Sequence, residues 1–407
     1  MRTDFLRGLP REVGILTAVA FTVALGFGIV APALPVFAHQ FGVGATAAAA
    51  VISAFAFMRF VSALGSGRLV DRFGERVLLA LGIGVVAVSS LLAGLAQSYA
   101  QLLVLRGIGG VGSALFSVSA MNLLLRTVGP ELRGRASGVY QSGFLVGGIS
   151  GPALGGLLTS VSLRAPFFVY AGTLVVAGAI GMVFLGRARL RERPDAGREE
   201  REQEQEQRVT LLAALRNRTY VAALTTNLAN GWASFGVRNA LIPLFVVEAL
   251  RRDPLWTGVG FAVVSVVQAL ALLPAGRIVD TRGRRVGMAG GAAVVTASMV
   301  LLTVASSLPV YLAAMVLLGA GASFLGVAPG AVVGDVAGGR SGTVVAAYQM
   351  SRDLGTIIGP LVAGALAQSL SYGSAFGVTA AIIGTAALLA AFSPETRALR
   401  ETRTGPH

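Results

Sequence analysis

The sequence predicts an all-α integral membrane protein with about twelve transmembrane helices in two pseudo-symmetric six-helix bundles. Three observations support this fold class. The 407 residues are 54% hydrophobic and only 13% charged, with a mean hydropathy of +0.74, whereas soluble domains are about half apolar and about one quarter charged. About twelve apolar runs are long enough to span a membrane, and landmark residues recur about 208 positions apart.

A helix needs roughly 20 apolar residues to cross about 30 Å of hydrocarbon. Runs of that length predict spans at 13–37, 46–66, 77–97, 99–122, 136–160, 165–186, 219–248, 256–274, 286–306, 308–332, 343–369 and 372–392. The first run extends to Phe37 without a small-residue cleavage site, so we interpret it as a span rather than a removed signal peptide.

The chain is predicted to be duplicated, because three landmarks recur in the same order. Pro35 matches Pro243, Gly67 matches Gly276, and the Gly-Pro pair at 151–152 matches the pair at 359–360. We therefore expect a bundle at 13–186 and a second at 219–392, with an N-terminal segment at 1–12 and a tail at 393–407. The segment 187–218 is rich in mixed charge and glutamine, which predicts a solvated linker.

Arginine placement predicts the orientation in the membrane. All 33 basic residues are arginine, and 26 of them fall on one side if both termini are cytoplasmic. Three others, Arg164, Arg251 and Arg252, fall on the opposite side. The positive-inside rule therefore predicts a multi-pass protein of a bacterial inner membrane with both termini cytoplasmic. The net charge of +14 is then explained by the arginines of the cytoplasmic segments, and it requires no nucleic-acid partner.

Several classes of chemistry lack their usual residues. The chain has no cysteine and only two histidines, His39 and His407. It contains no nucleotide-binding loop and no His-Glu-X-X-His zinc motif. We therefore expect no enzyme activity, no cofactor and no metal site.

Two related segments follow the second and eighth predicted spans. The first reads Gly67-Arg68-Leu-Val-Asp71-Arg-Phe-Gly74 and continues to Arg76. The second has the matching residues Gly276, Arg277, Asp280, Gly283 and Arg285. We expect both to form tight loops, since glycine allows sharp reversals. An aspartate there would pair with nearby arginines or with a helix N-terminus.

These segments resemble the signature of the major facilitator superfamily, and the resemblance covers the chain from about Val13 to Phe392. The resemblance implies that the first loop is a cytoplasmic gate element. In that family its aspartate contacts the start of the eleventh helix in the outward-facing state. Gly67, Asp71, Gly74 and Arg76 would then carry that role here.

Two further motifs lie within predicted spans. In the fourth span, Arg106, Gly110 and Gly112 match a family pattern whose arginine is linked to proton transfer in proton-coupled relatives. The fifth span contains the set Gly147, Gly151, Pro152, Gly155 and Gly156. Glycines spaced by four permit close helix packing, and the proline favours a kink. By resemblance this set is similar to the signature of drug-exporting antiporters.

Polar residues inside otherwise apolar spans are candidates for a solute pathway. Their spacing places several on shared helix faces. The candidates are Arg59, Gln141, Asn227, Asn230, Ser234, Arg238, Gln268, Tyr348, Arg352, Asp353 and Thr356. Four embedded arginines against one embedded aspartate, Asp353, fit an anionic or zwitterionic solute at least as well as a cationic one. The first span has no acidic residue, unlike that of many proton antiporters.

These observations predict a secondary active transporter that works as a monomer in the lipid bilayer by alternating access. The leading hypothesis is proton-coupled efflux of a small amphiphilic or anionic compound, a drug or a metabolite. An importer or facilitator of an organic anion, a sugar or a siderophore is the alternative within transport. Outside transport, a membrane sensor or an integral-membrane enzyme remains as the competing hypothesis.

Overall fold

A computed structural model describes residues 9–129, 132–185, 211–337 and 342–395 of the chain, and these residues form helices without a strand. Ten helices in this part of the chain are long and apolar enough to cross a membrane. The all-α membrane fold is therefore confirmed, while ten of about twelve predicted spans meet that test. The predicted spans at 219–248 and 343–369 do not, and both carry stripes of polar residues.

The chain divides into two compact units. The N-terminal unit comprises Met1–Ala33 and Ala54–Ala196, and the C-terminal unit comprises Leu34–Ser53 and Gly197–His407. The segment Leu34–Ser53 therefore groups with the second half of the sequence, although the repeat assigns it to the first.

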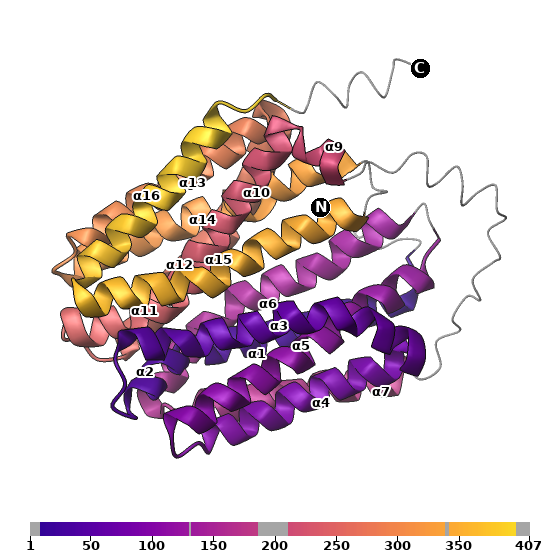
Figure 1. Ribbon diagram of the computed structural model, residues 1–407, viewed down its shortest axis with the longest axis horizontal. Coiled ribbons are helices and arrows are strands. Elements are labelled where there is room, and N and C mark those ends of the chain that lie inside the picture. Colours follow the sequence, from indigo (N-terminus) through magenta and orange to yellow (C-terminus); the bar gives the residue numbers. More distant parts are fainter. Residues whose placement is uncertain (1–8, 130–131, 186–210, 338–341, 396–407) are drawn as a thin grey trace. The chain divides into compact units, whose positions relative to one another are not determined.

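The N-terminal unit is an antiparallel helical bundle (Figure 1). Its helices are α1 (Arg11–Val30), most of α3 (Ala45–Phe73), α4 (Glu75–Gly94), α5 (Tyr99–Thr127), α6 (Arg133–Val161) and α7 (Ala165–Leu185). The short helix α2 (Ala33–His39) continues the first span after Pro32 interrupts it. Helix α1 packs against α6 and α7, and α4 packs against α5 and α7.

The C-terminal unit contains α9 (Leu211–Leu215), α10 (Arg218–Asn230), α11 (Arg238–Leu244), α12 (Leu255–Arg282), α13 (Arg284–Thr303), α14 (Leu308–Ala337), α15 (Gly342–Ser369) and α16 (Tyr372–Ala391). Helix α13 packs against α14 and α16, and α12 packs against α14. Large apolar side chains such as Tyr311 and Phe376 are fully buried in this unit, where they fill the space between helices.

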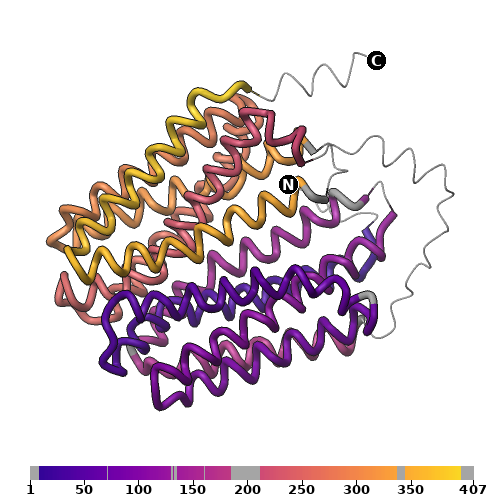
Figure 2. The backbone as a smooth tube through the Cα atoms, viewed as in Figure 1, coloured from indigo at the N-terminus to yellow at the C-terminus, as the bar shows by residue number. Residues whose placement is uncertain are grey.

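The seventh predicted span is one rod with two irregular stretches. Helix α10 continues through the π-helical segment η3 (Gly231–Val237), then α11, then the π-helical segment η4 (Phe245–Ala249). Figure 2 shows the chain running in one direction through these four pieces. The amide of Leu250 bonds to the carbonyl of Phe245 at 3.0 Å, a wide turn that follows Pro243. Such segments are frequent at functional sites.

Candidate functional site

The two aspartate motifs are helical rather than looped, which corrects the sequence-based expectation. Residues 67–73 form the last turns of α3, and residues 276–282 form the last turns of α12. Only Gly74 (φ 84°) and Gly283 (φ 112°) separate each helix from the next. Helical hydrogen bonding continues because the motifs lack proline, and it stops where glycine adopts a positive φ.

In the first motif, the residue after the linking glycine forms an ion pair. Glu75, the first residue of α4, accepts a hydrogen bond from Arg126 near the end of α5. The Glu75 side chain is 10% exposed and that of Arg126 is 41% exposed. The pair therefore joins the start of α4 to the end of α5. The side chain of Asp71 lies outside the described residues.

In the second motif, the corresponding residue is Arg284, which is buried. Its guanidinium donates from Nε to Asp335 at 3.2 Å and from Nη1 to Asp280 at 2.9 Å. It also donates to the carbonyl of Val279 at 2.8 Å. The motif aspartate Asp280 is thus held within its own bundle, by a partner that the sequence reading did not name.

The two ion pairs are equivalent by the repeat, but their charges are reversed. Glu75 precedes Arg284 by 209 positions, and Arg126 precedes Asp335 by the same number. The N-terminal unit places the acid at the start of α4, and the C-terminal unit places the base at the start of α13. The bridge between these helices is kept in both halves while each charge changes sign.

The start of α13 has a further partner from the tail. The carboxylate of Glu395 accepts hydrogen bonds from the backbone amides of Arg284 at 2.8 Å and Arg285 at 3.1 Å. An acid at a helix N-terminus satisfies amides that have no helical partner and interacts favourably with the helix dipole. Glu395 thus ties the chain after α16 to the second motif.

The glycine motif of α6 forms one packing face against α1. A Cβ atom added to Gly143, Gly147, Gly151 or Gly155 would meet the backbone oxygen of Thr17, Phe21, Leu25 or Ile29, respectively. Both series advance in steps of four residues, so the two helices are in contact along about four turns. Pro152 lies inside α6 and approaches Gly28, while Gly156 is buried. The motif therefore determines how closely α1 and α6 approach.

The same face recurs in the C-terminal unit. Gly355 of α15 would meet the backbone of Leu228 with a Cβ atom, and Gly359 would meet Trp232. Gly231 of η3 in turn faces the carbonyl of Arg352. The seventh span therefore packs on α15 through small residues. This contact brings the polar residues of the seventh span close to those of the eleventh span, which is α15.

Arg106 is buried within the N-terminal unit, at 2% exposure. Its guanidinium carbon lies 4.4 Å from the ring centroid of Phe55, and its Nε has no hydrogen-bond partner among the described residues. Gly110 contacts the backbone of Phe55 and Gly112 contacts that of Gly82. The motif thus packs α5 closely against α3 and α4 while a cation lies between them.

The polar stripe of the seventh span has one satisfied member. Asn227 donates to the carbonyl of Tyr348 at 2.6 Å and to Oγ of Ser351 at 3.3 Å. By contrast, Oδ1 of Asn230 and Oγ of Ser234 are buried without a partner in the described part of the chain. A buried polar atom without a partner costs free energy unless water or a ligand satisfies it.

Arginine and aromatic residues lie close to this stripe. Arg238 donates from Nε to the side chain of Asn239 at 3.3 Å and lies 5.6 Å from the ring of Phe261. Arg352 lies 5.5 Å from the ring of Phe235. These contacts stabilise cations away from water.

The remaining candidates contribute less to this arrangement. Thr356 bonds to the carbonyl of Arg352 at 3.0 Å, and Asp353 is half-buried on α15. Gln141 is exposed on α6, whereas Arg59 and Gln268 are half-buried in different units. The structure therefore brings together the candidates of the seventh and eleventh spans.

Sequence reasoning missed the polar partners that lie near helix ends. The sequence analysis did not single out Arg284, Asp335, Glu75 or Arg126, although the spacing of 51 residues within each pair, repeated in both halves, was a usable signal. It also missed His39, whose Nε2 lies 3.3 Å from the carboxylate of Glu248 in the C-terminal unit. The same carboxylate accepts a hydrogen bond from Tyr372 at 2.6 Å.

Comparison with known structures supports the fold. The chain superimposes on a bacterial homologue of the human lysosomal transporter Spinster with a TM-score of 0.77, at 15% identity and 100% coverage of both chains. The human organic anion transporter MFSD10 gives a TM-score of 0.65 at 16% identity, covering 94% of this chain and 100% of that one.

Sequence relatives match over part of their length. The chain is 28% identical over 171 residues to Multidrug resistance protein 1 of Bacillus subtilis (strain 168), a stretch that covers 42% of this chain and 44% of the relative. It is 27% identical over 182 residues to Quinolone resistance protein NorA of Staphylococcus aureus (strain MRSA252), covering 44% and 45%. The match thus spans less than half of each relative.

The sequence model of the Major Facilitator Superfamily matches residues 16–256 and again residues 224–406, so it covers both halves of the repeat. Members of this superfamily are transporters rather than enzymes. The chain therefore belongs to the Major Facilitator Superfamily and is a multi-pass membrane protein.

Proposed function

We propose that this transporter exports a small amphiphilic or anionic compound in exchange for protons, by alternating access. The observation that carries the proposal is that Oδ1 of Asn230 and Oγ of Ser234 are buried without a hydrogen-bond partner among the described residues, on the same span as the embedded Arg238. Two hydrogen-bonding groups and a cation would recognise a solute with an anionic or polar head. The neighbouring rings of Phe235 and Phe261 would contact its apolar part.

Only the first motif is proposed to act as a moving gate. In the second motif Arg284 holds Asp280. The equivalent residue in the first motif is Glu75, which carries the same charge as Asp71 and already pairs with Arg126. The position equivalent to the arginine that holds Asp280 is therefore occupied by an acid in the first motif. This difference supports a role for Asp71 in a contact that forms and breaks during transport, with Gly67, Arg68, Gly74 and Arg76 shaping its surroundings.

Proton coupling is proposed to use Asp353, with Arg106 as a second candidate. Asp353 lies near the middle of α15, far from the helix ends where other described carboxylates of the spans are found. Ionisable residues inside membrane spans are rare and are typical of proton and ion pathways. The drug and quinolone resistance names of the matched relatives support export as the direction.

Everted membrane vesicles energised by respiration test both direction and coupling. We expect solute to accumulate inside them from a panel of anionic and cationic fluorescent compounds, with anionic members preferred, and an uncoupler to abolish accumulation. Accumulation that is insensitive to the uncoupler would contradict proton antiport. Uptake only by right-side-out vesicles would instead support the importer.

The gate assignment is tested by comparing Asp71→Asn with Asp280→Asn. We expect the first variant to reach the membrane normally but to lose most of its transport. The second should lower the unfolding temperature, since it weakens the ion pair with Arg284, and leave transport by the folded fraction nearly unchanged. Equal transport defects in both variants would argue against a specific role for Asp71.

A further inference from the structure

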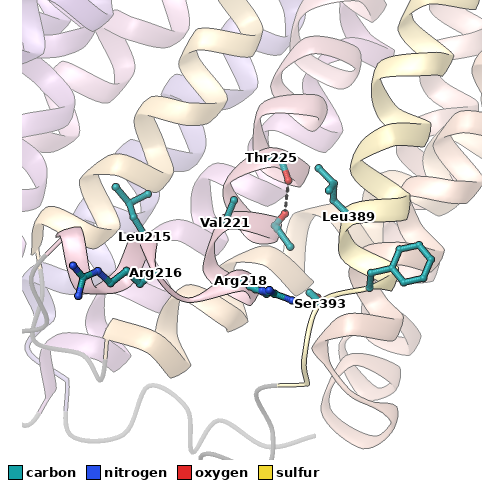
Figure 3. Close-up of a pocket in the computed structure, with 9 residues that line it drawn as sticks. Leu215, Arg216, Arg218, Val221, Thr225, Leu389 and Ser393 are labelled. Atoms are coloured by element: carbon teal, nitrogen blue, oxygen red, sulfur yellow. Dashed lines mark hydrogen bonds between the residues drawn. The ribbon is translucent and has the colours of Figure 1, made fainter.

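A pocket with a volume of about 320 Å³ lies where the chain enters the C-terminal bundle. It is bounded by α9, the start of α10 and the end of α16. Figure 3 shows Arg218 between Arg216 and Ser393, with Leu215 on the α9 side and Leu389 on the α16 side. The lining residues of α10 precede the polar stripe at 227–238 on the same helix, and no residue of that stripe lines the pocket.

The wall of this pocket is apolar and exposed. Phe392 is 83% exposed, Leu389 is 50% exposed, and Leu215 and Val221 also present much of their surface. In a membrane-spanning bundle, exposed aliphatic and aromatic side chains on the outer face of a helix contact lipid chains. The pocket therefore opens toward hydrocarbon along α16.

The floor of the pocket is cationic. Arg216 and Arg218 are both exposed, and neither forms an ion pair with a carboxylate in the described part of the chain. The described carboxylate closest to the pocket in sequence, Glu395, accepts hydrogen bonds from the start of α13 instead. The side chain of Arg218 points toward Ser393 at the end of α16, and that of Arg216 points to the opposite side of the pocket (Figure 3). A cationic floor beside an apolar wall complements a phosphate group whose acyl chains lie in the membrane.

The pocket is held by its own hydrogen bonds. Asn217 caps α10 by accepting from the amides of Thr219 and Tyr220. The Thr219 hydroxyl donates to the carbonyl of Pro394 at 2.8 Å, which joins the start of α10 to the chain after α16. The positions of the two arginine backbones are therefore fixed relative to the apolar wall.

We propose that this pocket binds an anionic phospholipid, with its phosphate at Arg218 and an acyl chain along Leu389 and Phe392, while Arg216 adds positive charge on the α9 side. Both arginines belong to the arginine-rich side of the protein, which the positive-inside rule assigns to the cytoplasm. The lipid on that side of a membrane carries negative headgroups. The bound lipid would fix the junction between the linker and the C-terminal bundle.

Native mass spectrometry of the full chain, released from nanodiscs of phosphatidylglycerol and phosphatidylcholine, tests this proposal. We expect the unmodified protein to retain phosphatidylglycerol selectively. The double variant Arg216→Gln with Arg218→Gln should retain about 30-fold less, because each arginine near the surface contributes roughly a fivefold preference for anionic lipid. A Phe392→Ser variant should weaken retention without changing the preference for the headgroup.

A matched control is available at another exposed arginine pair, Arg251 and Arg252, in the turn between η4 and α12. The variant Arg251→Gln with Arg252→Gln removes the same charge and should leave retention unchanged. Unchanged retention in the pocket variant, or equal losses in both double variants, would overturn the proposal. Retention that inorganic phosphate or glycerol 3-phosphate displaces at equal concentration would overturn the lipid assignment in favour of a soluble anion.

Discussion

At the scale of single residues, the embedded polar groups divide into those that the fold satisfies and those that it leaves unpaired. Asn227 bonds to two groups on α15, whereas Asn230 and Ser234, on the same stripe, have buried oxygen atoms without a described partner. The first kind stabilises the bundle. The second kind is available to a solute or to water, so the two kinds should respond differently to mutation.

Replacing Asn227 with alanine should lower the free energy of unfolding by about 1 kcal/mol, because an interhelical hydrogen bond in a membrane contributes about that much. Replacing Asn230 with alanine should leave stability unchanged and raise KM about fivefold, the equivalent of one neutral hydrogen bond. Unfolding in mixed micelles and vesicle transport measure the two effects. A stability loss in both variants, with KM unchanged, would remove Asn230 from the solute site.

The reversed ion pairs allow a sharper test of the proposed gate role of Asp71. The double variant Glu75→Arg with Arg126→Glu copies the arrangement of Arg284 and Asp335 into the N-terminal unit. We expect it to fold, since the bridge between α4 and α5 is retained. Transport should nevertheless fall, because an arginine at position 75 can hold Asp71 as Arg284 holds Asp280.

The matching control is the single variant Arg126→Ala, which breaks the bridge without placing a cation beside Asp71. It should lower thermal stability, by about 1 kcal/mol for a partly exposed pair, while the folded fraction transports normally. A double variant that transports at the level of the unmodified protein would show that Asp71 needs no distant partner.

At the scale of elements, the contact between α1 and α6 depends on the absence of side chains. Gly147 and Gly151 face the carbonyls of Phe21 and Leu25, while the adjacent Gly148 has open space around its Cβ position. Gly147 and Gly151 thus lie on the face of α6 that packs against α1, whereas Gly148 lies on a face that makes no close contact at its Cβ position. The sequence predicted close packing here, and the structure identifies α1 as the partner.

Alanine at Gly147 or Gly151 should force α1 and α6 apart and destabilise the protein by about 1–3 kcal/mol. Alanine at Gly148 should be neutral or stabilise by up to about 1 kcal/mol, since it only reduces the conformational freedom of the unfolded chain. Thermal unfolding of the three variants in one detergent compares them directly. If Gly148→Ala were as harmful as the others, the packing face would be wrongly assigned.

Helix α13 depends on a residue from the tail, because Glu395 accepts from two of its first amides. Replacing Glu395 with alanine should destabilise the protein by about 1 kcal/mol, a value typical of a lost N-terminal cap. Hydrogen exchange should be faster at the amides of Arg284 and Arg285 and unchanged at the start of α4. Uniform exchange changes across both units would indicate a global effect instead.

At the scale of the whole molecule, the segment Leu34–Ser53 links the two halves of the sequence, since it precedes the rest of α3 yet groups with the C-terminal unit. Ser53 donates to the carbonyl of Ile357 at 2.7 Å, and the amide of Thr46 bonds to Gln368 at 3.2 Å. Alternating access by relative movement of the repeats would require these contacts to break in each cycle.

An engineered disulfide tests that requirement in a chain that has no cysteine of its own. A Cβ atom at Gly364 would lie 3.1 Å from Cβ of Ala49, slightly inside the usual disulfide spacing of about 3.5–4.5 Å. Oxidation of the Ala49→Cys, Gly364→Cys variant should stop transport, and reduction should restore it. Either single-cysteine variant should be insensitive to oxidant. Full transport by the oxidised double variant would rule out separation at this point.

The helices and the repeat could be predicted from the sequence, because the length of apolar runs and the recurrence of glycine and proline residues can be read directly along the chain. Sequence reasoning could not place Gly67 to Phe73 in a helix, since the same glycines also suit a loop, and the sign of φ at Gly74 decides between them. The contact of Glu395 with the start of α13 joins residues 111 positions apart, and no recurring spacing announces it, so only tertiary packing reveals this contact. The π-helical segments have no sequence period of their own.

The reversed ion pairs also bear on how two related halves assemble without exchanging helices. If α4 packed against α14, Glu75 would meet Asp335, and if α13 packed against α5, Arg284 would meet Arg126. Both wrong pairings place like charges together at the edge of a membrane, where repulsion is weakly screened. The opposite charges at equivalent positions of the two halves therefore disfavour pairing of a helix with the wrong half.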